Sequence, residues 1–175
     1  MYYHRRSIRL NNFDYSNDGY YFVTICAQNR KNIFGEIENG KMILNTNGLI
    51  FKIWLLNLIN RFNIEINDYQ IMPNHLHMIV KIVGAIHESP KNDIKKINKR
   101  ANRDSPLQKR SVLSKIIGYL KMNVSKEIGL KLFQRNYYEH IIRNEKEYLK
   151  IREYIRLNPE MWWRDRNNLE GDLKI

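Results

Sequence analysis

The 175-residue sequence contains one cysteine, Cys26, and no long apolar run. A single cysteine cannot form an internal disulfide, which excludes the disulfide frameworks of small secreted domains. The longest apolar stretch, residues 49–59, is interrupted by Lys52 and Asn57 and is too short to span a bilayer. The first ten residues lack the apolar core of a signal peptide. We therefore expect a cytoplasmic protein without a membrane-spanning segment.

Acidic residues are few relative to basic ones. The chain has 30 Lys and Arg residues against 18 Asp and Glu residues, which gives a formal net charge of +12 and a pI of about 9.8. A small domain does not need this much charge for solubility. Clustered positive charge favours a polyanionic partner, because each neutralised phosphate releases condensed counterions. We expect nucleic acid rather than a membrane; a ribosomal partner, an anionic membrane surface or a merely Lys-rich solvated surface are the alternatives.

The hydrophobic patterning predicts an α+β protein. Alternating apolar residues predict strands in 19–30, 63–72 and 75–83, and Asn39-Gly40 between two short apolar segments predicts a hairpin. Helices are predicted over 45–62, as a mostly buried helix, over 111–129 and over 144–158, with an extended segment at 132–143. This order predicts a ferredoxin-like fold, with a mainly antiparallel sheet and the helices packed on one face.

We interpret residues 1–175 as a single domain with three distinct segments. A basic arm covers about 1–18, a long charged loop about 84–110, and a tail about 160–175. The loop contains eight Lys and Arg residues against three acids. Loops of this length inside compact domains are usually functional or disordered, so the loop is either a nucleic-acid contact or a mobile surface insertion.

Two histidines, His75 and His77, stand one residue apart in the predicted strand over 75–83. Side chains at i and i+2 of a strand point to the same face, so both imidazoles can converge on one ion. Two ligands do not complete a metal site, and one cysteine is too few for the common zinc patterns. The spacing leaves two interpretations open, half of a metal site or two incidental histidines.

The last predicted helix carries a tyrosine and a polar partner one turn apart. Tyr154 and Asn158 are at i and i+4, which places them on the same helical face. Tyr119 and Asn123 form an equivalent pair on the preceding helix. The extended segment adds two further candidates, Tyr137 and Tyr138. Spacing alone does not choose a nucleophile among these tyrosines.

The motifs "MPNHLHMIV" and "FQRNYYEHIIRNEKEYLKIREYIRLNP", with the opening "GYYFVTICAQNRKNIFGEI", resemble the REP-associated tyrosine transposases. These are single-tyrosine HUH endonucleases related to the small insertion-sequence transposases, and the similarity covers roughly residues 5 to 165. The resemblance implies a ferredoxin-like fold and a divalent metal, Mg²⁺ or Mn²⁺, held by His75, His77 and Asn158. It also implies that Tyr154 is the nucleophile.

The implied activity is that of a metal-dependent single-strand DNA endonuclease and strand transferase. Such an enzyme acts at hairpin-flanked DNA through a covalent 5′-phosphotyrosine. The alternatives are a DNA hairpin-binding protein that does not cleave and an RNA-binding accessory protein or ribonuclease. Monomer and homodimer both remain open.

Further residues are expected to support the site or to contact DNA. Glu139 and His140 match the family signature, and we expect a structural or supporting role for both. The candidate DNA contacts are the basic residues of the arm and the loop, namely Arg5, Arg6, Arg9, Lys95, Lys96, Lys99 and Arg100.

Overall fold

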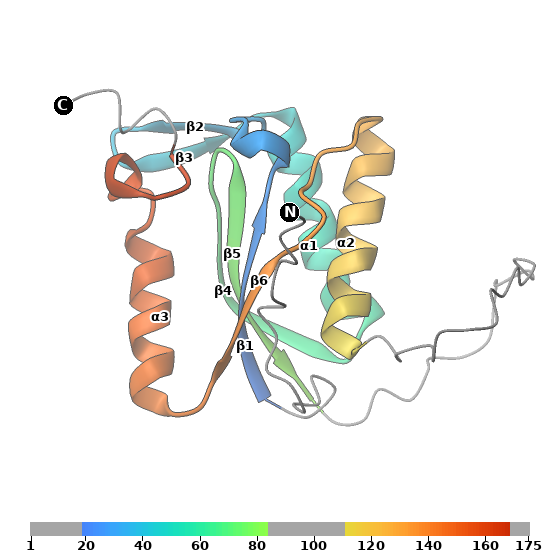
Figure 1. The fold of residues 1–175 in the computed structure, drawn as a ribbon, viewed down its shortest axis with the longest axis vertical. Coiled ribbons are helices and arrows are strands. Elements are labelled where there is room, and N and C mark those ends of the chain that lie inside the picture. Colours follow the sequence, from blue (N-terminus) through green and yellow to red (C-terminus); the bar gives the residue numbers. More distant parts are fainter. Residues whose placement is uncertain (1–18, 84–110, 169–175) are drawn as a thin grey trace, which may run out of the picture.

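The structure is a computed structural model that describes residues 19–83 and 111–168 (Figure 1). The predicted arm, the predicted loop and residues 169–175 lie outside the described residues. The predicted DNA contacts in the arm and the loop therefore lie outside them too, namely Arg5, Arg6, Arg9, Lys95, Lys96, Lys99 and Arg100.

The elements follow the predicted order. They are β1 (Gly19–Cys26), β2 (Gly35–Glu38), β3 (Lys41–Leu44), α1 (Thr46–Arg61), β4 (Ile64–Ile71), β5 (His75–Ile82), α2 (Val112–Ile128), β6 (Tyr138–Ile142) and α3 (Glu145–Leu157). Short 3₁₀ turns cover Gln28–Arg30 and Trp162–Arg164. None of the helices in the described part of the chain is long and apolar enough to cross a membrane.

Four strands form one antiparallel sheet in the order β4-β5-β1-β6. The β2–β3 hairpin is a separate two-stranded sheet, and it comes between β1 and α1 in the sequence. Without this hairpin, the order β1-α1-β4-β5-α2-β6 is the βαββαβ unit of the ferredoxin-like fold. The predicted α+β class, the antiparallel sheet and the ferredoxin-like arrangement are confirmed.

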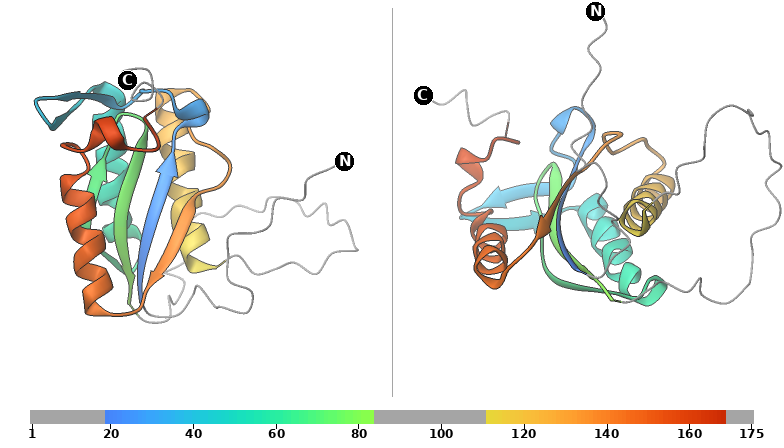
Figure 2. Two further views of the ribbon diagram at one scale, coloured as in Figure 1. Left: turned by 60° about the vertical axis from the view of Figure 1, so that its left-hand side comes forward. Right: turned by 60° about the horizontal axis from the view of Figure 1, so that its bottom comes forward.

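The helices lie on both faces of the sheet, so the predicted one-sided packing needs correction. Helices α1 and α2 cover one face, and α3 covers the other (Figures 1 and 2). The central strand β1 explains this, because Tyr21 and Val23 point into the α1–α2 core while Phe22 between them points the opposite way. Apolar side chains on both faces of a central strand need cover on both faces.

The smaller core lies beneath α3. It consists of Phe22 on β1, Ile79 on β5, Ile142 on β6 and Ile155 on α3. These four buried side chains anchor α3 across the sheet. The larger core fills the space between the sheet and helices α1 and α2.

Helix α1 is less buried than predicted. Its buried residues are Gly48, Phe51, Leu55 and Leu58, which recur at intervals of three and four and so form one stripe. Leu49 is 51% exposed because it lies outside that stripe. The prediction of a mostly buried helix is therefore wrong, because the tertiary contacts of this apolar segment lie on one side.

Local chemistry sets the helix ends and the hairpin turn. The side chains of Asn45, Ser111 and Asn144 each accept a hydrogen bond from a backbone N–H in the first turn of the following helix. In the hairpin, Asn39 and Gly40 have φ values of 50° and 73°, as a type I′ turn requires. The Asn144 cap begins the helix that carries Tyr154.

Candidate metal and nucleophile site

The two histidines lie at the start of β5, on the face that α3 covers. Along β5, Leu76 and Met78 point into the α1–α2 core, so His75 and His77 point to the opposite side. Both side chains are almost fully buried. Their Nε2 atoms are 3.0 Å apart, which confirms that the two rings converge.

The neighbours of His75 determine which of its ring nitrogens carries the proton. The Asn74 amide nitrogen donates to the backbone carbonyls of Arg30 and Asn167, at 3.0 and 2.8 Å. The amide oxygen of Asn74 therefore faces His75 Nδ1, 2.8 Å away, as an acceptor. His75 Nδ1 must donate to it, which leaves the lone pair on Nε2.

His77 has an equivalent partner. Its Nδ1 lies 2.8 Å from the Thr24 hydroxyl, which can accept a proton from the ring. The lone pairs on Nε2 of His75 and Nε2 of His77 then point towards the same position, where both could bind one ion. Consider two ligand atoms that each lie 2.0–2.1 Å from one ion and subtend a right angle at it. They would be about 3 Å apart, which is the distance between the two Nε2 atoms.

Burial keeps both rings neutral. It lowers the pKa of His75 to about 4, although the nearby Asp165 carboxylate acts in the opposite direction. The pKa of His77 is also well below 6.5, because of burial and then the proximity of His75. Neutral imidazole is the form that binds metal ions.

A carboxylate that the sequence did not indicate completes the group. Asp165 follows the second 3₁₀ turn, and its Oδ2 is 3.7 Å from His75 Nε2. One ligand atom from each of His75, His77 and Asp165 lies within 4.8 Å of the others. No spacing rule connects residue 165 with the histidines, since only the folding of the tail across the end of the sheet brings them together.

Asn158, the ligand implied by the family resemblance, lies beside this group. It is buried at the end of α3, and its Nδ2 donates to Asp165 Oδ2 at 3.1 Å. Its Oδ1 is buried and accepts no hydrogen bond from the residues that the structure describes, which leaves this oxygen able to bind an ion. Two imidazoles, a carboxylate and an amide oxygen together fit a divalent ion such as Mg²⁺ or Mn²⁺.

The hydroxyl of Tyr154 lies 3.2 Å from His77 Nε2. Its ring packs edge-on against Phe22 and His77, yet the side chain is 44% exposed. Burial raises the pKa of Tyr154 above 10, and Asp165 adds to this effect. The positive charge of Arg166 and a hydrogen bond from Asn158 act in the opposite direction.

A small cavity of about 300 Å³ opens beside Tyr154. The residues that line this cavity come from helix α3 and the segment after it, namely Lys150, Glu153, Tyr154, Leu157, Asn158 and Met161. The tyrosine is therefore both held by the core and accessible.

The other candidate tyrosines have different surroundings. Tyr119 packs edge-on against Phe62 and Trp54 on the α1–α2 side of the sheet, away from the histidines. The Tyr137 hydroxyl lies 3.2 Å from Ser114 on α2. Tyr138 packs its ring edge-on against Phe22.

Glu139 and His140 lie on opposite faces of β6. Glu139 pairs with Val23 of the α1–α2 core, so its side chain points away from the histidine pair. His140 Nε2 lies 2.7 Å from the Glu147 carboxylate. His140 thus joins β6 to the first turn of α3, which agrees with a structural role.

The chain matches no family model. A REP-associated tyrosine transposase, solved with a REP hairpin bound, superposes with a TM-score of 0.60 and 21% identity, over 90% of this chain and 74% of that one. This similarity establishes that the protein has the same fold as that transposase.

A closer sequence relative is a Haemophilus influenzae protein named only as uncharacterized. It is 39% identical over 179 residues, which cover 93% of this chain and 92% of that protein. The chain belongs to the same family as this H. influenzae protein.

Proposed function

We propose that this protein is a transposase of the tyrosine HUH type, a metal-dependent endonuclease and strand transferase that acts on single-stranded DNA beside a hairpin. The observation that carries the proposal is the hydroxyl of Tyr154, 3.2 Å from His77 Nε2 and next to the His75–His77–Asp165 group. The shared fold with a transposase that binds a REP hairpin supports it.

The proposed metal ligands are His75, His77 and Asp165, with the Oδ1 atom of Asn158 as a fourth donor. We expect Mg²⁺ or Mn²⁺, because carboxylate and amide oxygens favour hard divalent ions. When bound, such an ion polarises the scissile phosphate and offsets the charge that develops on its oxygens.

Tyr154 is the proposed nucleophile. Its phenol oxygen attacks phosphorus, the bond from phosphorus to the 3′-oxygen breaks, and the proton lost by the phenol is balanced by one gained at that 3′-oxygen. The products are a 5′-phosphotyrosine and a free 3′-hydroxyl. A 3′-hydroxyl from another strand can reverse the step, so that strands are joined without ATP.

The phenol needs help to ionise, since its pKa is raised by burial. Arg166 can provide this help, because its positive charge lowers the pKa of Tyr154 and so favours the phenolate. The same guanidinium can bind a phosphate oxygen of the incoming strand. The backbone carbonyl of Arg166 accepts a hydrogen bond from Arg30 Nη1, which places a second cation at this end of the sheet.

The test is covalent capture of DNA. The substrate is a labelled hairpin with single-stranded flanks, taken from palindromic repeats beside the gene, incubated with Mn²⁺ and run on a denaturing gel. We expect a protein–DNA adduct with the unmodified protein and none with Tyr154→Phe, while DNA binding is retained.

Tyr119→Phe is the matched control and should form the adduct normally, because Tyr119 lies on the other side of the sheet. An adduct with Tyr154→Phe would contradict the assignment of the nucleophile. Tight hairpin binding by the unmodified protein without any adduct, in Mg²⁺ or Mn²⁺, would instead identify a hairpin-binding protein that does not cleave.

A further inference from the structure

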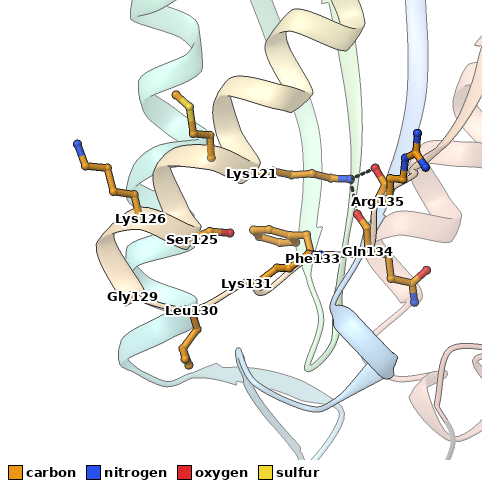
Figure 3. Close-up of a pocket in the computed structure, with 10 residues that line it drawn as sticks. Lys121, Ser125, Lys126, Gly129, Leu130, Lys131, Phe133, Gln134 and Arg135 are labelled. Carbon is orange, nitrogen blue, oxygen red and sulfur yellow. Dashed lines mark hydrogen bonds between the residues drawn. The ribbon is translucent and has the colours of Figure 1, made fainter.

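An open pocket lies at the C-terminal end of α2, between this helix and the segment 129–135 (Figure 3). Its volume is about 600 Å³. We propose that this pocket binds the sugar–phosphate backbone of the DNA strand that runs to the scissile phosphate. The proposal rests on the proposed function and adds a binding surface within the described part of the chain.

The pocket is basic. Four of its ten lining residues are Lys121, Lys126, Lys131 and Arg135, and none of the ten is acidic. Lys126, Lys131 and Arg135 are exposed, so their charged groups can meet a ligand from solvent. Such a cluster of like charges favours a ligand with several negative charges in succession.

The fourth cation holds the wall of the pocket in place. Lys121 Nζ donates to the backbone carbonyls of Gln134 and Arg135, at 3.0 and 3.5 Å (Figure 3). It also donates to the carbonyl of Asn136 at 3.0 Å. Burial lowers the pKa of Lys121 to about 8, so the amine remains mostly protonated at pH 7. Lys121 thus fixes the course of the segment that carries Arg135.

Apolar side chains lie among these cations. Met122 is 60% exposed and Leu130 is 63% exposed, while the buried Phe133 contributes its ring to the pocket. Apolar surface beside cations matches a nucleotide chain, in which the bases are flat and apolar and the phosphates are charged. The pocket is also open rather than enclosed, which suits a polymer better than a small molecule.

The pocket lies at the same end of the sheet as the proposed active site, but on the face that α2 covers, whereas His75 and His77 face α3. The backbone of Gln134 donates to the carbonyl of Cys26 at 3.0 Å, and Cys26 pairs with His75 on the neighbouring strand. Two strand spacings, about 10 Å, therefore separate the backbone at Gln134 from that at His75. A DNA strand bound in the pocket would pass around this end of the sheet to present the next phosphates to Tyr154.

The helix dipole does not supply this binding. The pocket adjoins the C-terminal end of α2, where the partial charge of the helix is negative and disfavours an anion. Lys126 in the last turn opposes that charge. Side-chain cations must therefore provide the attraction, which makes the proposal testable by substitution.

The experiment measures binding of a fluorescent, mixed-sequence, single-stranded oligodeoxynucleotide at several salt concentrations. The pocket variant combines Lys126→Ala, Lys131→Ala and Arg135→Ala. The control variant combines Lys41→Ala, Lys52→Ala and Lys115→Ala, three exposed lysines outside the pocket that remove the same charge.

We expect the pocket variant to reduce the slope of log K against log salt by about 2, since each single-strand phosphate contact contributes about 0.7. At 0.1 M salt this corresponds to a loss of affinity of up to about a hundredfold. Equal weakening in both variants, or none in either, would overturn the proposal. Tighter binding of matched RNA than DNA would overturn the choice of ligand.

Failure of the proposed function would look different. If the unmodified protein forms no covalent adduct but the pocket variant alone loses affinity, the cleavage activity is wrong and the binding surface stands. If the adduct forms and the pocket variant binds DNA as well as the control variant does, the cleavage activity stands and the proposed binding surface is wrong. Thermal unfolding of both variants checks that lost affinity does not reflect lost structure.

Discussion

At the scale of single residues, the histidine pair depends on neighbours that determine where each proton lies. Asn74 has its amide nitrogen occupied by two backbone carbonyls, so its oxygen holds the proton of His75 on Nδ1. This places a lone pair on the Nε2 atom that faces His77. Burial of both rings then favours their neutral, metal-binding form.

The proposed third ligand, Asp165, can be tested by substitution. We predict that Asp165→Ala weakens Mn²⁺ binding at least tenfold, because it removes the only carboxylate of the three-residue group. Asp165→Asn keeps an acceptor for the backbone N–H of Asn167 but loses the charge, and should be intermediate. Calorimetric titration of Mn²⁺ measures both effects.

Glu65→Ala is the control, because Glu65 pairs with Lys81 on the surface away from the site. If Asp165→Ala binds Mn²⁺ as well as the unmodified protein does and Asn158→Ala does not, the ligand set implied by the family resemblance is the correct one.

At the scale of elements, α3 is the part whose position decides the site. Beyond the apolar contact of Ile155, polar contacts around Glu147 and around Asp68 hold it. Near its start, Glu147 accepts hydrogen bonds from the backbone of Arg143 and lies 2.7 Å from His140. Further along, Asp68 on β4 pairs with Arg152 and Arg156 at 3.3 and 3.1 Å.

We predict that Asp68→Ala loosens α3 and slows adduct formation more than it weakens DNA binding. The two arginines are 38% and 59% exposed, so the loss should be only about 1 kcal/mol of unfolding free energy, close to that of a surface pair. Urea unfolding measures the stability, and hydrogen exchange of the α3 amides measures the loosening.

Glu65→Ala again provides the matched control, because Glu65 lies on β4, as Asp68 does, and its carboxylate pairs with Lys81 on β5. Unchanged exchange in α3 after Asp68→Ala would mean that apolar packing alone positions the helix.

At the scale of the whole molecule, the buried histidines make the stability of the metal-free protein depend on pH. An unfolded histidine has a pKa of about 6.5, whereas burial lowers the pKa of His75 to about 4 in the folded state. Below pH 6.5 the unfolded chain therefore takes up a proton that the folded chain does not. The contribution of His75 to the free energy of unfolding is therefore fully present above pH 6.5 and is lost as the pH decreases towards 4.

We predict a lower melting temperature at pH 5 than at pH 7 in the presence of a chelator. One unit of pKa difference corresponds to about 1.4 kcal/mol, so His75 alone accounts for roughly 2 kcal/mol over this range. The double variant His75→Asn, His77→Asn should show a shallower dependence. An unchanged dependence in that variant would assign the effect to other groups.

Much of the fold could be predicted because its elements depend on residues close together in the chain. Alternation in β1 and β5, the caps at Ser111 and Asn144, and the Asn39-Gly40 turn are local features, and the structure has each of them. The common direction of the two imidazoles is local as well, since i and i+2 share a face on any strand.

The sequence by itself thus determined the strands, the helices, the net charge and the paired histidines. Only the tertiary structure decided that α3 covers the face opposite α1 and α2, that Tyr154 rather than Tyr119 meets His77, and that Asp165 joins the histidines. The reason is physical. Periodicity describes which side of an element a residue occupies, whereas contact between residues 75 and 165 depends on how packed elements bring distant parts of the chain together.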